Sequence, residues 1–425
     1  MLRKFMHFAF FMLLLVALSG VFMRTYPFLA QPQIPYDNVL HAHSHLGLLG
    51  WEFLAVFIIF LAIFWKNILH QREAITICVF LVVVSLLMFL AFLLQGYSLF
   101  SIILSTLHIF VEYWAALFIY RQMKEVKTKY PIATLYMYGA LLALVISSIG
   151  PYALAFISAN GWTEYAIFEI AVYFYLHFQY NGWLTLFLFG VFLIILQTKN
   201  IFINRKLFQL GFWIYSLFLF PSFLLSVLWV EEFGTTVHIV GALGGVGQWA
   251  AIITILYASH QAMADWRKYF SALPRFALSL TFFLLFVKST MELGLISPSL
   301  ATLVYETRSI IIGYLHLTLL GFITVFLFAQ LWLIDYLAIN IKAVISFTIF
   351  LIGFGLNELL LFLQGLWSWL DRGMIPFYIE GLLIAAILLT IGVITLWFSL
   401  KQKERYYETI GLPPNFTRKW EKVQL

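Results

Sequence analysis

The stretch HAHSHLGLLGW, residues 41–51, places three histidines directly before a long apolar run. From His45 onward it follows the pattern H-x-x-x-x-G-[W/F]. The same pattern begins at His177 in HFQYNGW and at His316 in HLTLLGF, at intervals of 132 and 139 residues. A pattern that recurs at a nearly constant interval indicates an internal structural repeat.

The composition indicates a protein of the lipid bilayer. Of the 425 residues, 63% are hydrophobic and 10% are charged, and the mean hydropathy is +0.96, well outside the balance of soluble domains. The single cysteine, Cys78, excludes a disulfide framework and a cysteine-based zinc or iron–sulfur site. A metal would have to use histidine, carboxylate or tyrosine ligands. No nucleotide-binding or nucleic-acid motif occurs, so no nucleic-acid partner is expected.

Apolar runs long enough to cross a bilayer predict an all-α integral membrane protein. We expect a transmembrane domain over residues 1–400 and a short cytoplasmic tail over 401–425. The twelve predicted spans lie near 5–23, 40–65, 75–94, 98–121, 132–158, 166–196, 206–229, 236–260, 273–294, 308–333, 342–365 and 375–400.

The basic residues predict the topology. With twelve spans, 21 of the 25 lysines and arginines fall on one face, and only Arg24, Lys288, Arg308 and Arg372 lie on the other side or near it. Because positive charge stays in the cytoplasm, both termini are expected there, in a bacterial-type inner (plasma) membrane. The first run begins like a signal peptide, but no clear small-residue cleavage site follows it, so we retain it as a helix.

The histidines divide the twelve predicted helices. His45, His177 and His316 fall on helices 2, 6 and 10, while His108 and His238 fall on helices 4 and 8, 130 residues apart. This spacing predicts three pseudo-symmetric arcs of four helices. All five histidines would lie roughly 5–16 Å below the outer surface at a helical rise of 1.5 Å per residue, and ionisable groups within a bilayer normally face the protein interior.

The pattern also has a packing interpretation. In an α-helix, the glycine five residues after the histidine lies about 140° around the axis, so it would not share the histidine's face. We expect it to let a neighbouring helix approach closely, as small residues do in membranes. On a pure packing account, the aromatic residue that follows would be interfacial.

With twelve helices, three arcs and histidines on helices 2, 6 and 10, the chain resembles subunit I of the heme-copper oxidases and nitric oxide reductases. The pattern H-x-x-x-x-G-[W/F] also resembles the NnrS family of heme- and copper-containing membrane proteins linked to nitric oxide stress. The resemblance implies that His45 and His316 hold a low-spin heme b and that His177 belongs to a copper site. The chain could hold one bis-histidine heme alone, or a heme with a rearranged metal site that draws on His177, His108 and His238. Which histidine of HAHSH is the heme ligand stays open: His45 fits the repeat, and His41 and His43 would then form an interfacial rim or an outer metal site.

Departures from the oxidase pattern limit the expected chemistry. The oxidases carry a second histidine on helix 10 and a histidine pair on helix 7, whereas this chain has only His316 on helix 10 and no histidine in 206–229. These differences argue against proton-pumping oxygen reduction and leave open whether the protein is an oxidoreductase. Electron transfer, or a response to nitric oxide or oxygen, is the function that the resemblance implies, with electrons from another protein or a quinone.

Other intramembrane polar residues allow two interpretations. Glu112 lies one turn from His108 and suits an orienting carboxylate, Lys288 and Glu292 have the spacing of an ion pair, and Glu358 lies in the outer half of helix 11. Such groups could supply protons to a redox centre or hydrogen-bond between helices. They also suit a secondary transporter, for which GALGGVGQW, 241–249, would be a broken helix at the substrate site.

Overall fold

The structure, a computed structural model, describes residues 1–30, 33–68, 70–230 and 233–401. The described part is helical, and its only extended pairing is an antiparallel bridge between Leu337 and Leu400. The predicted cytoplasmic tail lies, from residue 402 onward, outside the described residues.

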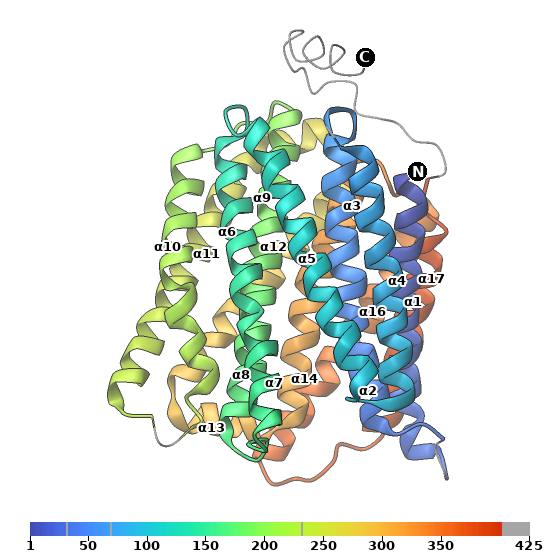
Figure 1. Cartoon of the computed structure of the whole chain (residues 1–425), viewed down its shortest axis with the longest axis vertical. Helices are drawn as coiled ribbons and strands as arrows, with labels where there is room; N and C mark the ends of the chain where they lie inside the picture. Colours follow the sequence, from blue (N-terminus) through green and yellow to red (C-terminus); the bar gives the residue numbers. More distant parts are fainter. Residues whose placement is uncertain (31–32, 69, 231–232, 402–425) are drawn as a thin grey trace.

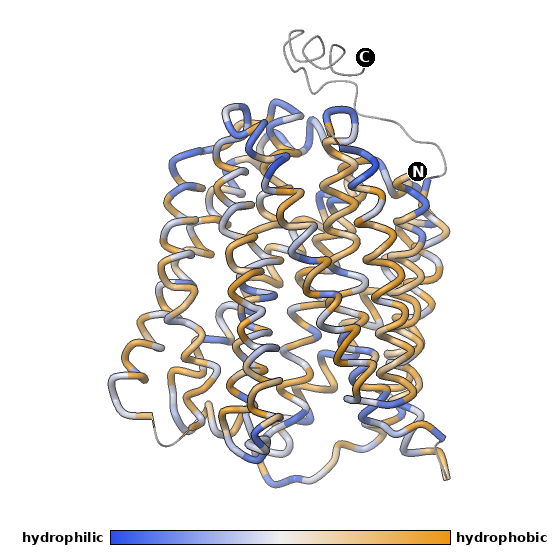
Figure 2. The backbone as a smooth tube through the Cα atoms, in the orientation of Figure 1, coloured by the Kyte–Doolittle hydropathy of each residue, from blue (hydrophilic) through white to orange (hydrophobic). Residues whose placement is uncertain are grey.

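The predicted count of twelve membrane spans is confirmed. Each is long and apolar enough to cross a bilayer, and Figure 2 shows hydrophobic residues along the middle of the bundle and hydrophilic residues gathered toward its two ends. The spans are Leu2–Phe28, Tyr36–Asn67, Gln71–Gln95, Leu99–Val126, Pro131–Ala159, Ala166–Thr198, Arg205–Val227, Thr235–Met263, Ala272–Ile296, Arg308–Leu333, Ile341–Trp369 and Tyr378–Trp397.

Several spans consist of more than one helical element (Figure 1). The α-helices are α1 (Leu2–Thr25), α2 (Tyr36–His45), α3 (Phe53–Phe64), α4 (Gln71–Gln95), α5 (Leu99–Val126), α6 (Pro131–Ser147), α7 (Ile149–Ala159), α8 (Ala166–His177), α9 (Thr185–Thr198), α10 (Arg205–Phe223), α11 (Thr235–Tyr269), α12 (Ala272–Leu293), α13 (Pro298–Glu306), α14 (Arg308–His316), α15 (Val325–Leu333), α16 (Ile341–Trp369) and α17 (Tyr378–Trp397). The 3-10 turns are η1 (Tyr26–Phe28), η3 (Trp65–Asn67), η5 (Leu224–Val227) and η6 (Gly294–Ile296). The π-helices are η2 (Leu46–Glu52), η4 (Phe178–Leu184) and η7 (Leu317–Thr324).

Each π-helix coincides with one copy of the histidine pattern. His45, His177 and His316 are the last residues of α2, α8 and α14, and a π-helix begins at the next residue in all three cases. The assumption of α-helical geometry across the pattern is therefore wrong. Hydrogen bonds in a π-helix join residues five apart, and such segments, which are rare, are frequent at functional sites. The repeat thus marks three local departures from the α-helix at the same place in three spans.

The pattern glycines allow neighbouring helices to approach closely, as predicted. A Cβ atom at Gly182 would lie 2.6 Å from the Cβ of Ala143 on α6. Real Cβ atoms do not come this close, so any larger residue would force the helices apart. At Gly50 the Cβ would lie 3.1 Å from Met12 Sδ on α1, and at Gly321 it would lie 2.6 Å from Phe354 Cζ on α16.

The three spans that carry the pattern form the centre of the bundle. In spans Tyr36–Asn67, Ala166–Thr198 and Arg308–Leu333, 89%, 89% and 61% of the most apolar window is buried, against 33–50% in the other nine spans. The helices that follow the three π-helices in these spans are α3, α9 and α15, and each of them contacts the other two. The second, sixth and tenth spans therefore meet at the centre of the bundle, whereas the grouping of the helices into three arcs of four stays a prediction.

The aromatic residues of the pattern belong to this core. Trp51, Trp183 and Phe322 are each at most 1% exposed, so an interfacial position for them is wrong. The indole of Trp51 donates to Thr324 Oγ1 at 3.1 Å, which joins the second and tenth spans. The ring of Trp183 lies 5.3 Å from that of Phe53, which joins the sixth span to the second.

The broken helix expected at 241–249 is also wrong. This stretch lies inside α11, one α-helix from Thr235 to Tyr269. Its glycines instead admit close neighbours: a Cβ atom at Gly244 would lie 2.3 Å from the carbonyl carbon of Pro221. The observation that favoured a transporter is therefore a packing feature between α10 and α11.

The first and last described spans meet at one end of the bundle. The guanidinium of Arg3 donates to the carbonyl oxygen of Lys401 and, at 3.1 Å, to that of Asp335. The Lys401 ammonium pairs with the Asp335 carboxylate. Because the spans alternate in direction, the ends of α5 and α9 lie at this same end, and the pattern histidines lie toward the opposite one (Figure 1).

Candidate functional site

His43 and His316 have the same hydrogen-bonding arrangement on different helices. His43 Nδ1 lies 2.9 Å from the carbonyl oxygen of Val16 and 3.1 Å from Ser19 Oγ, both on α1. His316 Nδ1 lies 2.8 Å from the carbonyl oxygen of Ile312, one turn earlier on α14. A carbonyl oxygen only accepts, so the proton of each neutral ring belongs on Nδ1. Each Nε2 then carries a lone pair, and within the described part of the chain neither Nε2 has a hydrogen-bond partner.

The two rings share a charged neighbour. His43 lies within electrostatic range of His316, and Arg24 lies within electrostatic range of both. Gly20 of α1 gives His43 its space, since a Cβ there would lie 3.5 Å from His43 Cε1. Arg24 has no carboxylate partner among the described residues. The outer half of the bundle thus brings together two imidazoles with free Nε2 atoms and one unpaired guanidinium.

His45 faces a different part of the bundle. Its ring stacks on Phe92 of α4 at 4.2 Å, and its Nδ1 lies 2.9 Å from the carbonyl oxygen of His41. Its Nε2 lies 3.4 Å from the hydroxyl of Tyr97, in the turn between α4 and α5. Burial raises the pKa of Tyr97 to about 12, so this hydroxyl stays protonated and can donate to Nε2. His41 packs on the same tyrosine, with ring centroids 4.5 Å apart.

His177 uses both ring nitrogens within the protein. Its Nε2 donates to the carbonyl oxygen of Leu219 at 2.8 Å, and its Nδ1 accepts from the Asn181 amide at 3.2 Å. The ring is 2% exposed. A metal could bind this histidine only if one of the two hydrogen bonds broke.

A buried ion pair lies next to His177. The predicted pairing of Lys288 with Glu292 is confirmed, with Nζ 2.9 Å from Oε1. The ammonium also donates to Asn181 Oδ1, so one amide links His177 to the cation. The hydroxyl of Tyr314, two residues before His316, donates to Glu292 Oε1 at 2.5 Å. These groups satisfy one another as a closed polar network.

The predicted pairing of His108 with Glu112 is likewise present. Nδ1 of His108 lies 3.0 Å from Glu112 Oε1, and Nε2 lies 3.1 Å from Ser85 Oγ, so both nitrogens are used. His238 lies near the start of α11, and its buried Nδ1 has no hydrogen-bond partner in the described part of the chain. Glu358 accepts from Asn357 at 3.0 Å through Oε1, while its buried Oε2 has no partner in the same described ranges.

Comparison with known structures identifies the architecture. A chain from a heme-copper terminal oxidase dimer superposes with a TM-score of 0.69, covering 95% of this chain and 85% of that chain at 14% sequence identity. This chain has a heme-copper terminal oxidase fold. The predicted fold class is therefore confirmed, and at this identity the likeness concerns the fold alone. No protein-family model and no curated protein sequence matches the chain. The resemblance to the NnrS family stays a prediction.

The residues of this oxidase fold suit a heme better than copper. Axial heme ligation requires a neutral imidazole with a free nitrogen and an oriented ring, and both His43 and His316 meet this requirement. Across the described ranges, no three histidine, cysteine or carboxylate side chains gather as metal ligands. The predicted metal residues His41, His43, His108, His177 and His238 are thus not brought together, and the Lys288 ammonium beside His177 would repel a copper ion.

Proposed function

We propose that the protein is a heme-binding membrane protein in which His43 and His316 bind the iron of one b-type heme through their Nε2 atoms. The observation that carries this proposal is the matched state of the two rings: each holds its Nδ1 proton on a backbone carbonyl and leaves Nε2 free. A backbone acceptor fixes both the tautomer and the orientation of the ring, which is how proteins prepare histidine ligands. The predicted ligand His45 also directs its Nδ1 at a backbone carbonyl, but its Nε2 is not free, because the Tyr97 hydroxyl lies 3.4 Å away and can donate to it.

Arg24 supports the same site. It interacts electrostatically with both imidazoles, and no carboxylate among the described residues pairs with it. A heme carries two propionate groups, and a guanidinium is the side chain best suited to pair with a carboxylate. Arg24 would therefore hold a propionate and limit the heme to one orientation.

Bis-histidine ligation points to electron transfer. When bound, the heme supplies one-electron chemistry at an iron whose two axial positions are taken, so no open position remains for a substrate. Around His177, where the resemblance implies copper, both ring nitrogens are used and the Lys288–Glu292 pair lies alongside, linked through Asn181. We therefore propose a heme that acts without a copper partner, and electrons would come from a membrane quinone or another protein. A role in a nitric oxide or oxygen response would depend on the protein or quinone that exchanges electrons with the heme.

The orientation in the membrane forms part of the proposal. With positive charge inside, the end of the bundle that holds Arg3 and Lys401 faces the cytoplasm, and His43 and His316 lie near the outer face. Counted from the start of each span at a rise of about 1.5 Å per residue, the two histidines are about 10 and 12 Å deep. The heme would exchange electrons most readily with a donor at the outer half of the bilayer.

The test is an absorption spectrum and a metal analysis of the full chain purified from cells supplied with ample heme. We expect a reduced-minus-oxidised spectrum of a low-spin b-type heme, iron at about one atom per chain, and no stoichiometric copper. A colourless, iron-free protein would contradict the proposal. Stoichiometric copper alongside the heme would contradict the part that concerns His177.

A further inference from the structure

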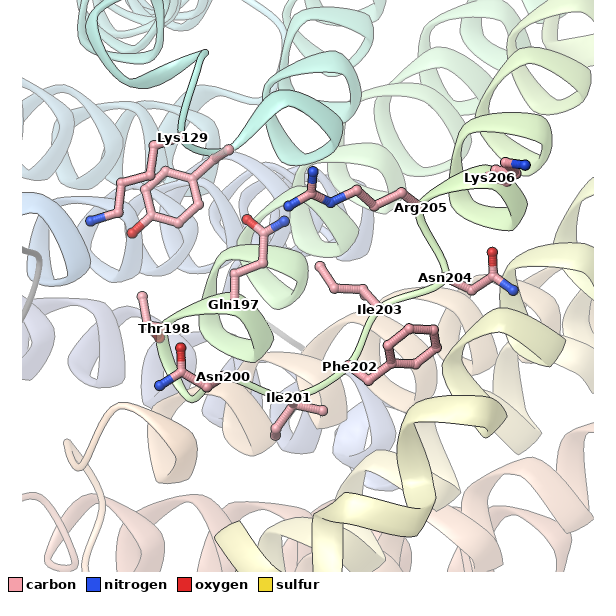
Figure 3. A pocket seen from close by; sticks show the side chains of 11 residues that line it. Lys129, Gln197, Thr198, Asn200, Ile201, Phe202, Ile203, Asn204, Arg205 and Lys206 are labelled. Carbon is pink, nitrogen blue, oxygen red and sulfur yellow. The ribbon is translucent and has the colours of Figure 1, made fainter.

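A basic pocket lies at the end of the bundle opposite the histidines. It has a volume of about 940 Å³ and lies between the α5–α6 turn and the connection from α9 to α10 (Figure 3). The heme proposal makes no use of it. The lining residues are Lys129, Tyr130, Gln197, Thr198, Asn200, Ile201, Phe202, Ile203, Asn204, Arg205 and Lys206.

The pocket is lined by positive charge. Lys129, Arg205 and Lys206 supply basic side chains, and the described residues of the lining include no carboxylate. The helix α10 begins at Arg205, and the Asn204 side chain caps it by accepting from Leu207 N at 3.3 Å. The first turn of a helix carries unpaired N–H groups and a partial positive charge, which favour anions. The cations and the helix terminus therefore favour the same kind of ligand.

Gln197 adds a buried polar group without a partner. Among the residues that the structure describes, neither its amide nitrogen nor its amide oxygen has a hydrogen-bond partner, although both atoms are buried. Figure 3 shows the amide turned toward the Arg205 guanidinium. An unpaired buried amide is costly, and its NH₂ group can donate to an anionic oxygen. Burial also raises the pKa of the neighbouring Tyr130, so its hydroxyl is protonated at neutral pH.

Apolar side chains beside the pocket place it at the membrane surface. Phe202 is 61% exposed, and one helical face of α10 below the pocket exposes Leu210 and Trp213. Exposed apolar and aromatic residues of a membrane span contact lipid, and aromatic residues gather at headgroup level. A ligand in the pocket would meet cations on one side and an acyl-chain environment on the other.

We propose that this pocket binds a phosphate-bearing anion. The Arg205 guanidinium, the first turn of α10 and the unpaired Gln197 amide match the oxygens of a phosphate group, as in basic pockets between transmembrane helices that hold acidic headgroups. Lys206 and Lys129 add positive charge to the lining on either side. A soluble phosphate and the headgroup of an acidic phospholipid share this chemistry. The adjoining apolar surface favours the lipid.

The experiment measures lipid retention by the full-length protein. The chain is placed in nanodiscs of mixed phosphatidylglycerol and phosphatidylcholine, released into mild detergent, and examined by native mass spectrometry for bound lipid. The test variant is Arg205→Gln/Lys206→Gln. The matched control is Arg72→Gln/Lys342→Gln, which removes the same charge at the same end of the bundle, outside the pocket lining. Gln197→Glu places a carboxylate in the pocket with almost no change in shape.

We expect selective retention of phosphatidylglycerol by the wild-type chain and the control. Each cation removed in the test variant should weaken phosphatidylglycerol binding about fivefold, a typical factor for a basic side chain at an anionic membrane surface. Gln197→Glu should weaken phosphatidylglycerol binding as well. Binding of inorganic phosphate with the same variant dependence would assign the soluble source. Equal loss in the control and the test variant, or no selective binding of either probe by the wild-type chain, would overturn the proposal.

Discussion

Lys288 and Glu292 form an ion pair inside the membrane, with Nζ 2.9 Å from Oε1, and the same ammonium donates to the Asn181 amide that holds His177. Lys288 is only 3% exposed. The pair and the amide thus fill the space beside the one histidine that the oxidase resemblance assigns to copper. The side chains beside His177 therefore neutralise one another.

Removal of one partner of this ion pair should strongly destabilise the protein. An uncompensated buried charge costs about 3–5 kcal/mol. We therefore expect Lys288→Met or Glu292→Gln to lower the free energy of unfolding by this amount. The double variant should lose less than the sum of the two single losses, because it leaves no charge unpaired. Reversible unfolding in detergent measures all three. Additive losses would mean that the two side chains do not act as a pair.

His177→Ala should leave the heme spectrum unchanged and lower the stability. The substitution leaves the Leu219 carbonyl and the Asn181 amide without their buried partner, at a cost of about 1–3 kcal/mol. The absorption spectrum and the unfolding midpoint are compared with those of the wild-type chain. A change in bound metal or in the low-spin spectrum would show that His177 takes part in cofactor binding.

Arg24→Gln should lower the midpoint potential of the heme by tens of millivolts. A nearby cation destabilises the ferric state, which carries one more positive charge than the ferrous state, so its removal favours oxidation. A redox titration monitored by absorption gives the value. Arg372→Gln, which removes a positive charge near the same membrane surface, is the control. Equal shifts in the two variants would argue against a specific contact between Arg24 and the heme.

Gly182→Ala should disturb the packing of the π-helix η4 against α6. The added Cβ would lie 2.6 Å from the Cβ of Ala143, and overpacking of this kind costs about 1–3 kcal/mol. Gly355→Ala serves as the control, because a Cβ at Gly355 of α16 meets nothing within 4 Å. The thermal midpoints of the two variants should therefore differ, with Gly182→Ala lower. Equal midpoints would mean that the backbone at η4 relaxes without cost.

Much of the fold could be predicted because membrane spans are local features. Runs of apolar residues give the twelve spans, and the interval between His45, His177 and His316 identifies the spans that form the core. The π-helices could not be predicted, because the residues after each histidine are compatible with an ordinary α-helix. They are evident only in the three-dimensional structure, where α1, α6 and α16 pack against Gly50, Gly182 and Gly321.

The choice between His43 and His45 could not be made from the sequence either. Residues two apart point to different sides of a helix, and which side faces the heme depends on the position of α1. The acceptor for His43 is Val16, 27 residues away, whereas His45 packs on Phe92 of α4. Arg24 was detectable as one of four basic residues on the outer side, but its proximity to both histidines is a tertiary feature.

The most direct test of the central claim is the low-spin heme spectrum of the single variants His43→Ala, His316→Ala and His45→Ala, each purified as the full chain. We predict that His43→Ala and His316→Ala lose the low-spin spectrum or convert it to a high-spin one, because each leaves an axial position open. The variant His45→Ala should keep the wild-type spectrum. Loss of the low-spin spectrum in His45→Ala together with its retention in His43→Ala would contradict the account.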